Sequence, residues 1–175
     1  GRVEAPFREQ PERRPSDGGA AAALLALAQA LGRLLGDLLA GIGMSREDVF
    51  IANVLKCRPP QNRDPQPVEI DACQEWLFAQ LDLIRPTVVA TLGNFSTKLL
   101  RGDPTGITRL HGRPEERVIG PRRVRLLPLF HPAAALYTPS NVEVLREDFR
   151  RIPELLAMGP PPQPDAGMPV AVAEP

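Results

Sequence analysis

The sequence predicts an α/β fold in which helices cover both faces of a short, mostly parallel sheet. Short apolar runs typical of buried strands occur at residues 49–55, 87–93 and 124–130. Segments with helical periodicity separate these runs. Strands that alternate with helices form right-handed crossover units, which place consecutive strands parallel in one sheet.

The first expected element is a helix with one apolar stripe, which Gly41 and Gly43 can end. The stripe has steps of four, three, four and four residues, and comprises Leu27, Leu31, Leu34, Leu38 and Ile42. A turn or short cap at residues 45–48 then leads into the strand expected at 49–55. A proline-rich loop follows, and after it a second helix that Pro86 stops. The apolar stripe of this helix comprises Ile70, Cys73, Leu77, Leu81 and Ile84.

The second half continues the alternation of strands and helices. After the strand at 87–93, Asn94 can cap a helix that runs through Leu100. In the strand expected at 124–130, Pro128 indicates an edge strand or a strand end. Residues 141–158 form a closing helix, with apolar side chains on or near one face.

Composition divides the chain into one domain with irregular ends. The 175 residues are 43% hydrophobic, which is enough to bury a core, and the 21 prolines gather mainly at both ends and in the loop after residue 57. We expect residues 1–20 to be disordered or a miscalled N-terminus, 21–158 to form the domain, and 159–175 to be a disordered tail. No apolar run is long enough to span a membrane, and the alanine- and leucine-rich run from Ala20 does not resemble a signal peptide, because a mixture of acidic and basic residues precedes it. We therefore expect a cytoplasmic monomer.

Charge is balanced over the whole chain but not locally. Net charge is zero, yet residues 101–125 carry seven arginines against three acidic residues. A solvated surface and a phosphate-facing strip both explain this excess, and the sequence does not choose between them.

Ligands of open α/β sheets bind beyond the carboxyl ends of the strands, which directs attention to Asn53, Gly93, Asn94 and His131. Asn53 lies inside an apolar run, so its carboxamide needs a partner, either the backbone or the edge of a nucleobase. His131 could donate to a developing anion or hold a phosphate, or it could be a loop residue without a role. His111 lies in a sequence that indicates a turn.

Several enzyme classes lack their motifs here. The sequence contains no G-x-S-x-G nucleophile elbow, no G-x-G-x-x-G fingerprint and no phosphate-binding P-loop. The two cysteines, Cys57 and Cys73, allow three interpretations: a buried apolar residue at Cys73, a disulfide, or a pair of thiolate ligands. Their spacing alone does not decide among them.

Three segments, SREDVFIANVLKCRPPQNRDPQPVEIDAC, LIRPTVVATLGNFSTKLL and LPLFHPAAAL, resemble the family 4, iron-sulfur uracil-DNA glycosylases. The resemblance runs in order over about residues 32–151. It implies a three-layer α/β/α fold and a base-excision-repair hydrolase that flips uridine out of DNA and hydrolyses its N-glycosidic bond.

The resemblance also implies roles for individual residues. Asn53 would recognise the uracil edge, and His131 would support the departing uracil anion. Gly93, Asn94 and Pro132 would lie with them against the DNA substrate. Cys57 and Cys73 would be the second pair of ligands to a 4Fe-4S cluster. A lysine nucleophile is not expected, and the chain contains only Lys56 and Lys98.

The N-terminal segment departs from the family pattern. Residues 1–30 contain no cysteine and no GEAPG-type loop, and Phe7 is their only aromatic residue. We therefore expect the N-terminal part to be missing or divergent, as a truncated or frameshifted coding sequence would produce, and excision to be impaired. The alternatives are a non-catalytic DNA-binding or interaction remnant, and a structural fragment without a function of its own.

Overall fold

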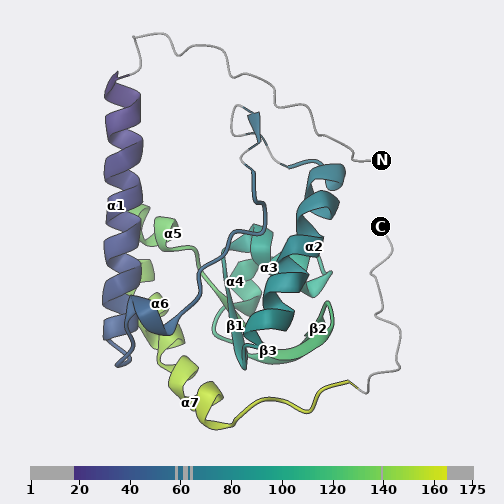
Figure 1. Ribbon diagram of the computed structural model, residues 1–175. Coiled ribbons are helices and arrows are strands. Elements are labelled where there is room, and N and C mark those ends of the chain that lie inside the picture. The colour runs from purple at the N-terminus through teal and green to yellow at the C-terminus, as the bar shows by residue number, and fades with distance from the viewer. Residues whose placement is uncertain (1–17, 58, 61–62, 64, 139, 165–175) are drawn as a thin grey trace.

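A small sheet lies between two layers of helices in the computed structural model, which describes residues 18–57, 59–60, 63, 65–138 and 140–164 (Figure 1). The strands are β1 (Val88–Leu92), β2 (Glu115–Ile119) and β3 (Arg122–Leu129), in the order β1-β3-β2. β1 pairs with β3 in parallel, and β2 pairs with β3 antiparallel. The predicted α/β fold class is confirmed, with one parallel and one antiparallel strand pair in place of a mostly parallel sheet.

The helices divide between the two faces of the sheet. One layer comprises α1 (Gly18–Ala40), α5 (Pro132–Tyr137), α6 (Ser140–Phe149) and α7 (Arg151–Ala157). The other comprises α2 (Pro67–Ile84) and α3 (Asn94–Arg101). Two shorter helices, the 3₁₀ helix η1 (Arg46–Asp48) and α4 (Ile107–Leu110), lie in the connections.

Alternate side chains of β3 supply the two halves of the core. Leu127 and Leu129 pack among the helices of the α1 layer, whereas Val124 and Leu126 face α2, and all four are fully buried. This alternation follows from the two-residue period of a strand. β3 is therefore the central strand around which both helical layers assemble.

α1 ends where its sequence predicts, and α2 begins at a capping box. α1 stops at a glycine-rich turn in which Gly43 has a φ of 74° and the Met44 N–H bonds to the Leu39 carbonyl. α2 starts with Pro67 in its first turn and a capping box between Gln66 and Glu69.

The strand predicted at residues 49–55 does not form. Phe50 and Ile51 are 60% and 42% exposed, and residues 50–55 make no backbone–backbone hydrogen bond within the described chain. An apolar run becomes a strand only where a neighbouring strand pairs with it, and the described residues provide none at this place. The segment is instead tied to α2 at Lys56.

A hairpin that the sequence did not predict links β2 to β3. Its turn includes Gly120, whose φ is 56° and whose Cα faces Phe78 so closely that a Cβ would lie 2.7 Å from the Phe78 Cγ. The charged residues of β2 hid its alternating burial pattern, whereas the strand at 124–130 was predicted. The predicted closing helix is also two helices, because Pro153 has no N–H to bond to the carbonyl of Phe149.

The described part of the tail is packed, contrary to the expected disorder from residue 159. Gln163 exchanges two hydrogen bonds with the backbone of Arg123, at 3.0 and 3.1 Å. Residues 165–175, like residues 1–17, lie outside the described chain. Within the described ranges, no helix has the length and apolar character needed to cross a membrane.

Candidate active site

The carboxyl ends of the parallel strands β1 and β3 bring Gly93 and His131 together. The Gly93 N–H donates to the Leu129 carbonyl at 2.8 Å, which continues the sheet past the end of both strands. Gly93 has φ 88° and ψ 179°, and a Cβ at this position would lie 3.1 Å from the Cβ of His131. Only glycine adopts this conformation readily and leaves room for the histidine.

Two buried threonine hydroxyl groups fix the backbone carbonyl of Gly93. The Thr97 side chain in α3 donates to the Gly93 carbonyl at 2.7 Å, and the Thr91 and Thr97 hydroxyls lie 2.8 Å apart. Asn94 was predicted to cap this helix, but the N-cap is Gly93. The Asn94 carboxamide oxygen instead accepts the Ile107 N–H at 2.7 Å, and so connects α3 to α4.

His131 is held as a neutral hydrogen-bond donor. It is the N-cap of α5, and its Nδ1 accepts the Ala133 N–H at 3.1 Å. Because the backbone group can only donate, Nδ1 carries no proton, and the neutral ring carries its proton on Nε2. Loss of hydration on the protein side of the ring lowers the pKa of His131, which favours this neutral form. Pro132 is buried in the first turn of α5, where its fixed φ suits a helix start.

Asn53 lies on the segment that does not form a strand. Its side chain is exposed, so water can satisfy the carboxamide, and the premise that burial demands a protein partner is wrong. The Asn53 carbonyl accepts the Lys56 ammonium at 3.0 Å, and the same ammonium donates to the Gln80 side chain of α2 at 2.7 Å. One lysine therefore fixes the backbone at Asn53 against α2, while the carboxamide faces solvent.

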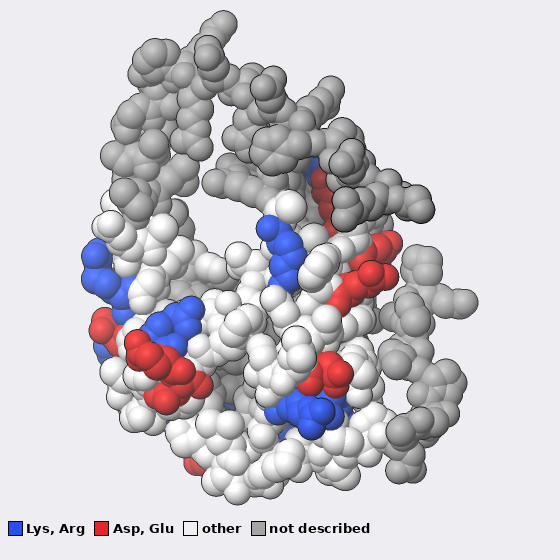
Figure 2. All heavy atoms as spheres, viewed as in Figure 1, with Lys and Arg blue, Asp and Glu red and all other residues white. Residues whose placement is uncertain are grey.

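The arginine excess of residues 101–125 is partly consumed within the protein. Arg101 and Arg117 both bind Glu115, at 2.5 and 3.2 Å, and Arg125 lies 3.9 Å from Glu116. Burial would raise the pKa of Glu115, but the hydrogen bonds from the two arginines outweigh it and keep that pKa below its usual value. On the face drawn in Figure 2, positive and negative side chains lie side by side. Three of the seven arginines are thus paired with acidic side chains of the protein itself, which reduces the local positive excess.

The two cysteines lie near each other but offer only half of the ligands for a cluster. The N–H of Lys56, the residue before Cys57, contacts the Cys73 sulfur at 3.3 Å, and both cysteines are free thiols. A four-iron cluster is held by four thiolates, whereas the sequence contains two cysteines. Within the described chain, no group of three or more His, Cys, Asp or Glu side chains could hold a metal ion. The residues of this chain do not fit a complete 4Fe-4S site.

A second histidine, which the sequence assigned only to a turn, joins the end of β3 to α6. His111 Nδ1 lies 2.8 Å from the carboxylate of Asp148, and its ring lies 4.4 Å from that of Phe130, between centroids. Asp148 is 6% exposed. The partners are separated by up to 37 residues in sequence, and the only local signal was the glycine that follows His111.

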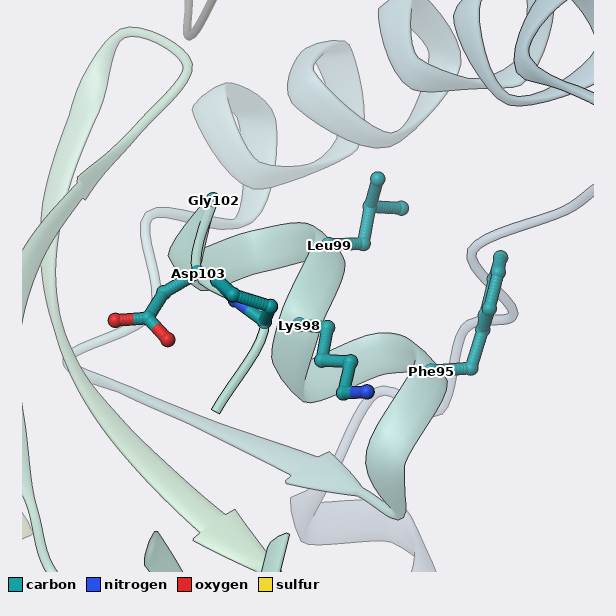
Figure 3. A pocket seen from close by; sticks show the side chains of 6 residues that line it. Phe95, Lys98, Leu99, Gly102 and Asp103 are labelled. Atoms are coloured by element: carbon teal, nitrogen blue, oxygen red, sulfur yellow. The ribbon is translucent and has the colours of Figure 1, made fainter. Parts of the chain in front are cut away.

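A shallow, open and mostly apolar depression follows the outer side of α3 (Figure 3). It is lined by Phe95, Lys98, Leu99, Gly102, Asp103 and Pro104. Neither His131 nor Asn53 borders it, so the candidate site is the sheet edge at Gly93 and His131 and not this depression.

The known proteins that this chain is similar to include several uracil-DNA glycosylases. The sequence profile of the uracil DNA glycosylase superfamily matches residues 5–155. The type-4 uracil-DNA glycosylase of Archaeoglobus fulgidus is 44% identical over 130 residues, which cover 72% of this chain and 65% of that protein. The type-4 enzymes of Sulfurisphaera tokodaii and Thermotoga maritima are 43% and 41% identical, over 60% and 62% of their lengths. The chain thus spans between three fifths and two thirds of the length of these relatives.

Proposed function

The chain belongs to the uracil DNA glycosylase superfamily, and we propose that it hydrolyses the N-glycosidic bond of uracil in DNA. The observation that supports this activity best is the neutral imidazole of His131 at the carboxyl ends of β1 and β3. Similarity to type-4 uracil-DNA glycosylases indicates the substrate. The proposal includes DNA as the partner and a cytoplasmic monomer as the working form.

His131 would act on the leaving group. When the bond between C1′ of the sugar and N1 of the base breaks, the sugar gains oxocarbenium character and uracil leaves as an anion. A donor aimed at that anion strengthens its bond as charge develops, and so lowers the barrier. Nδ1 already accepts the Ala133 N–H, so Nε2–H is the donor that the neutral ring has left to offer. Water then supplies hydroxide to C1′ and a proton to uracil.

Asn53 would read the base. A carboxamide offers a donor and an acceptor side by side, which match O4 and N3–H of uracil. Cytosine presents the reverse pattern at the same edge and would leave both groups unsatisfied. The exposed side chain of Asn53 and the fixing of its backbone by Lys56 suit this role. Gly93 and Asn94 would lie along the DNA backbone, and Pro132 would set the path of the chain after His131.

For the cysteines, the proposal is limited to one half of a site. Cys57 and Cys73 would provide two thiolates of a 4Fe-4S cluster, as in the family that this chain resembles, and the other two ligands would come from outside this sequence. Iron content per chain and visible absorption of the purified protein measure whether a cluster is present. No catalytic step proposed here depends on it.

The direct test is excision from a labelled duplex that contains one deoxyuridine, with alkaline cleavage to reveal the abasic site and a thymine duplex as substrate control. We expect cleavage of the uracil strand alone. Binding of both duplexes without cleavage would support the non-catalytic alternative and refute the enzyme.

Substitution of Asn53 tests base recognition separately. We expect Asn53→Ala to lose about 100-fold in excision rate, because an unpaired uracil edge loses its transition-state partner, while DNA affinity changes little. Gln29→Ala, which removes an exposed carboxamide from α1, is the matched control. Equal rates for the Asn53 variant, the control and the unchanged chain would remove Asn53 from the site.

A further inference from the structure

We propose that His111 and Asp148 form a brace that positions the loop between β3 and α5, residues 130–131, through Phe130, the residue immediately before His131. His111 is a positioning residue in this proposal, because it does not touch the substrate. The inference rests on the proposed role of His131 in excision.

The brace joins three elements that are distant in sequence. His111 ends α4, Phe130 follows β3, and Asp148 lies in α6. The His111 ring packs on the Phe130 ring with an interplanar angle of 31°, and its Nδ1 donates to the buried Asp148 carboxylate. An N–H bonded to a buried carboxylate fixes the rotation of the imidazole, and the ring contact then fixes Phe130.

The backbone on the other side of this ring pair is equally restricted. The Gly112 N–H donates to the Pro128 carbonyl at 2.8 Å. Gly112 has a φ of 66°, and a Cβ there would overlap the Asp148 carboxylate, so no larger residue can occupy the position. The loop is therefore held from the β1 side by the contact between Gly93 and His131. On the opposite side, the Gly112 hydrogen bond to Pro128 fixes the end of β3, and the ring contact between His111 and Phe130 fixes the loop itself.

A structural role alone would not require this arrangement at this place. Phe130 packs against the apolar core but is only partly buried, so burial alone leaves one side of its ring open for the contact with His111. A polar brace with fixed geometry instead limits where the next residue can point. A displacement of a catalytic group by about 1 Å can cost up to 100-fold in rate.

Two substitutions remove the contact from either side, and a third provides a control. His111→Asn keeps an N–H donor for Asp148 but removes the ring, and Phe130→Leu keeps apolar volume but removes the partner ring. Val124→Ala removes buried volume from the same strand on the opposite face, where it does not contact the loop. All three are compared below their melting temperatures, after thermal unfolding has shown that each is folded.

Nuclear magnetic resonance gives a readout that does not need activity. The chain has two histidines, so His111→Asn leaves a single imidazole and identifies the His131 signals. We expect the His131 pKa to rise toward its usual value in both loop variants, because the ring leaves its partly dehydrated position, and to stay unchanged in Val124→Ala.

Single-turnover excision gives the second readout. We expect both loop variants to excise about 10- to 100-fold more slowly with DNA affinity unchanged, and Val124→Ala to excise at the original rate. A His131 pKa and an excision rate that match the control in both loop variants would overturn the brace. If the unchanged chain does not excise uracil, that result counts against the proposed function, and the His131 titration alone decides whether the brace exists.

Discussion

Gly93→Ala tests whether the sheet edge is built around the histidine. Gly93 lies between β1 and α3, and its N–H and carbonyl groups both have partners, in Leu129 and Thr97. The substitution adds one methyl group and changes no charge. Any effect therefore comes from backbone conformation and from the contact with His131.

The backbone angles of Gly93 and its close contact with His131 both make alanine unfavourable at this position. With φ 88° and ψ 179°, the residue occupies a region that is almost restricted to glycine and costs other residues about 1–3 kcal/mol. The added Cβ lies 3.1 Å from the His131 Cβ, and the neighbour must move by a few tenths of an ångström to relieve it. Inserting a methyl group into a filled space adds about 1–3 kcal/mol. Together these give an expected loss of about 2–6 kcal/mol in the free energy of unfolding.

Urea denaturation measures this loss, with Gly32→Ala as the control. Gly32 lies inside α1 with nothing within 4 Å of its missing Cβ, so alanine there should stabilise the chain by about 0.5–1 kcal/mol. The same chemical change should thus have opposite signs at the two positions. A Gly93→Ala protein as stable as the unchanged chain would refute both the strain and the close approach to His131.

Two further substitutions probe the same edge. Thr97→Val keeps the shape of a fully buried side chain but removes the hydroxyl between Thr91 and the Gly93 carbonyl, so urea denaturation should show a loss of about 1–3 kcal/mol; Ser96→Ala, at a less buried hydroxyl, should cost less. For His131→Asn, the pH dependence of stability should become flatter. The folded His131 has a pKa below 6.5, so the unfolded chain binds the proton first and acidification from about pH 7.5 to about pH 5.5 destabilises the fold; unfolding free energies at both pH values, which should differ less in the variant, measure this effect.

Local sequence patterns predicted the elements whose neighbours the chain supplies. Periodicity located α1 and α2, and β-branched runs located β1 and β3. The same reasoning failed at residues 49–55, because pairing decides whether an apolar run is a strand and pairing is not a local property. β2 was missed for the opposite reason: its arginines and glutamates indicated a solvated surface, although the antiparallel hairpin buries Ile119.

The candidate site was predictable where it follows from topology. Parallel strands end at one edge, and this rule alone placed Gly93 beside His131. It gave no information on His111 and Asp148, because their meeting depends on how α6 packs against the sheet. Polar pairs formed by tertiary packing leave no periodic signal in the sequence.

The protein holds His131, the leaving-group half of the proposed site, more firmly than Asn53, the base-reading half. This difference predicts separate effects on uracil binding and on the rate of bond cleavage. His131 is fixed by the N-cap of α5 and by the contact with Gly93. Asn53 depends on one lysine, in a segment without backbone–backbone hydrogen bonds within the described chain. Ordering each backbone residue costs about 1–2 kcal/mol, and a base would have to order this segment as it binds. We therefore expect weak uracil binding combined with a leaving-group site that is already in place. A proline or a cross-link that fixes residues 50–55 should then lower KM more than it raises kcat.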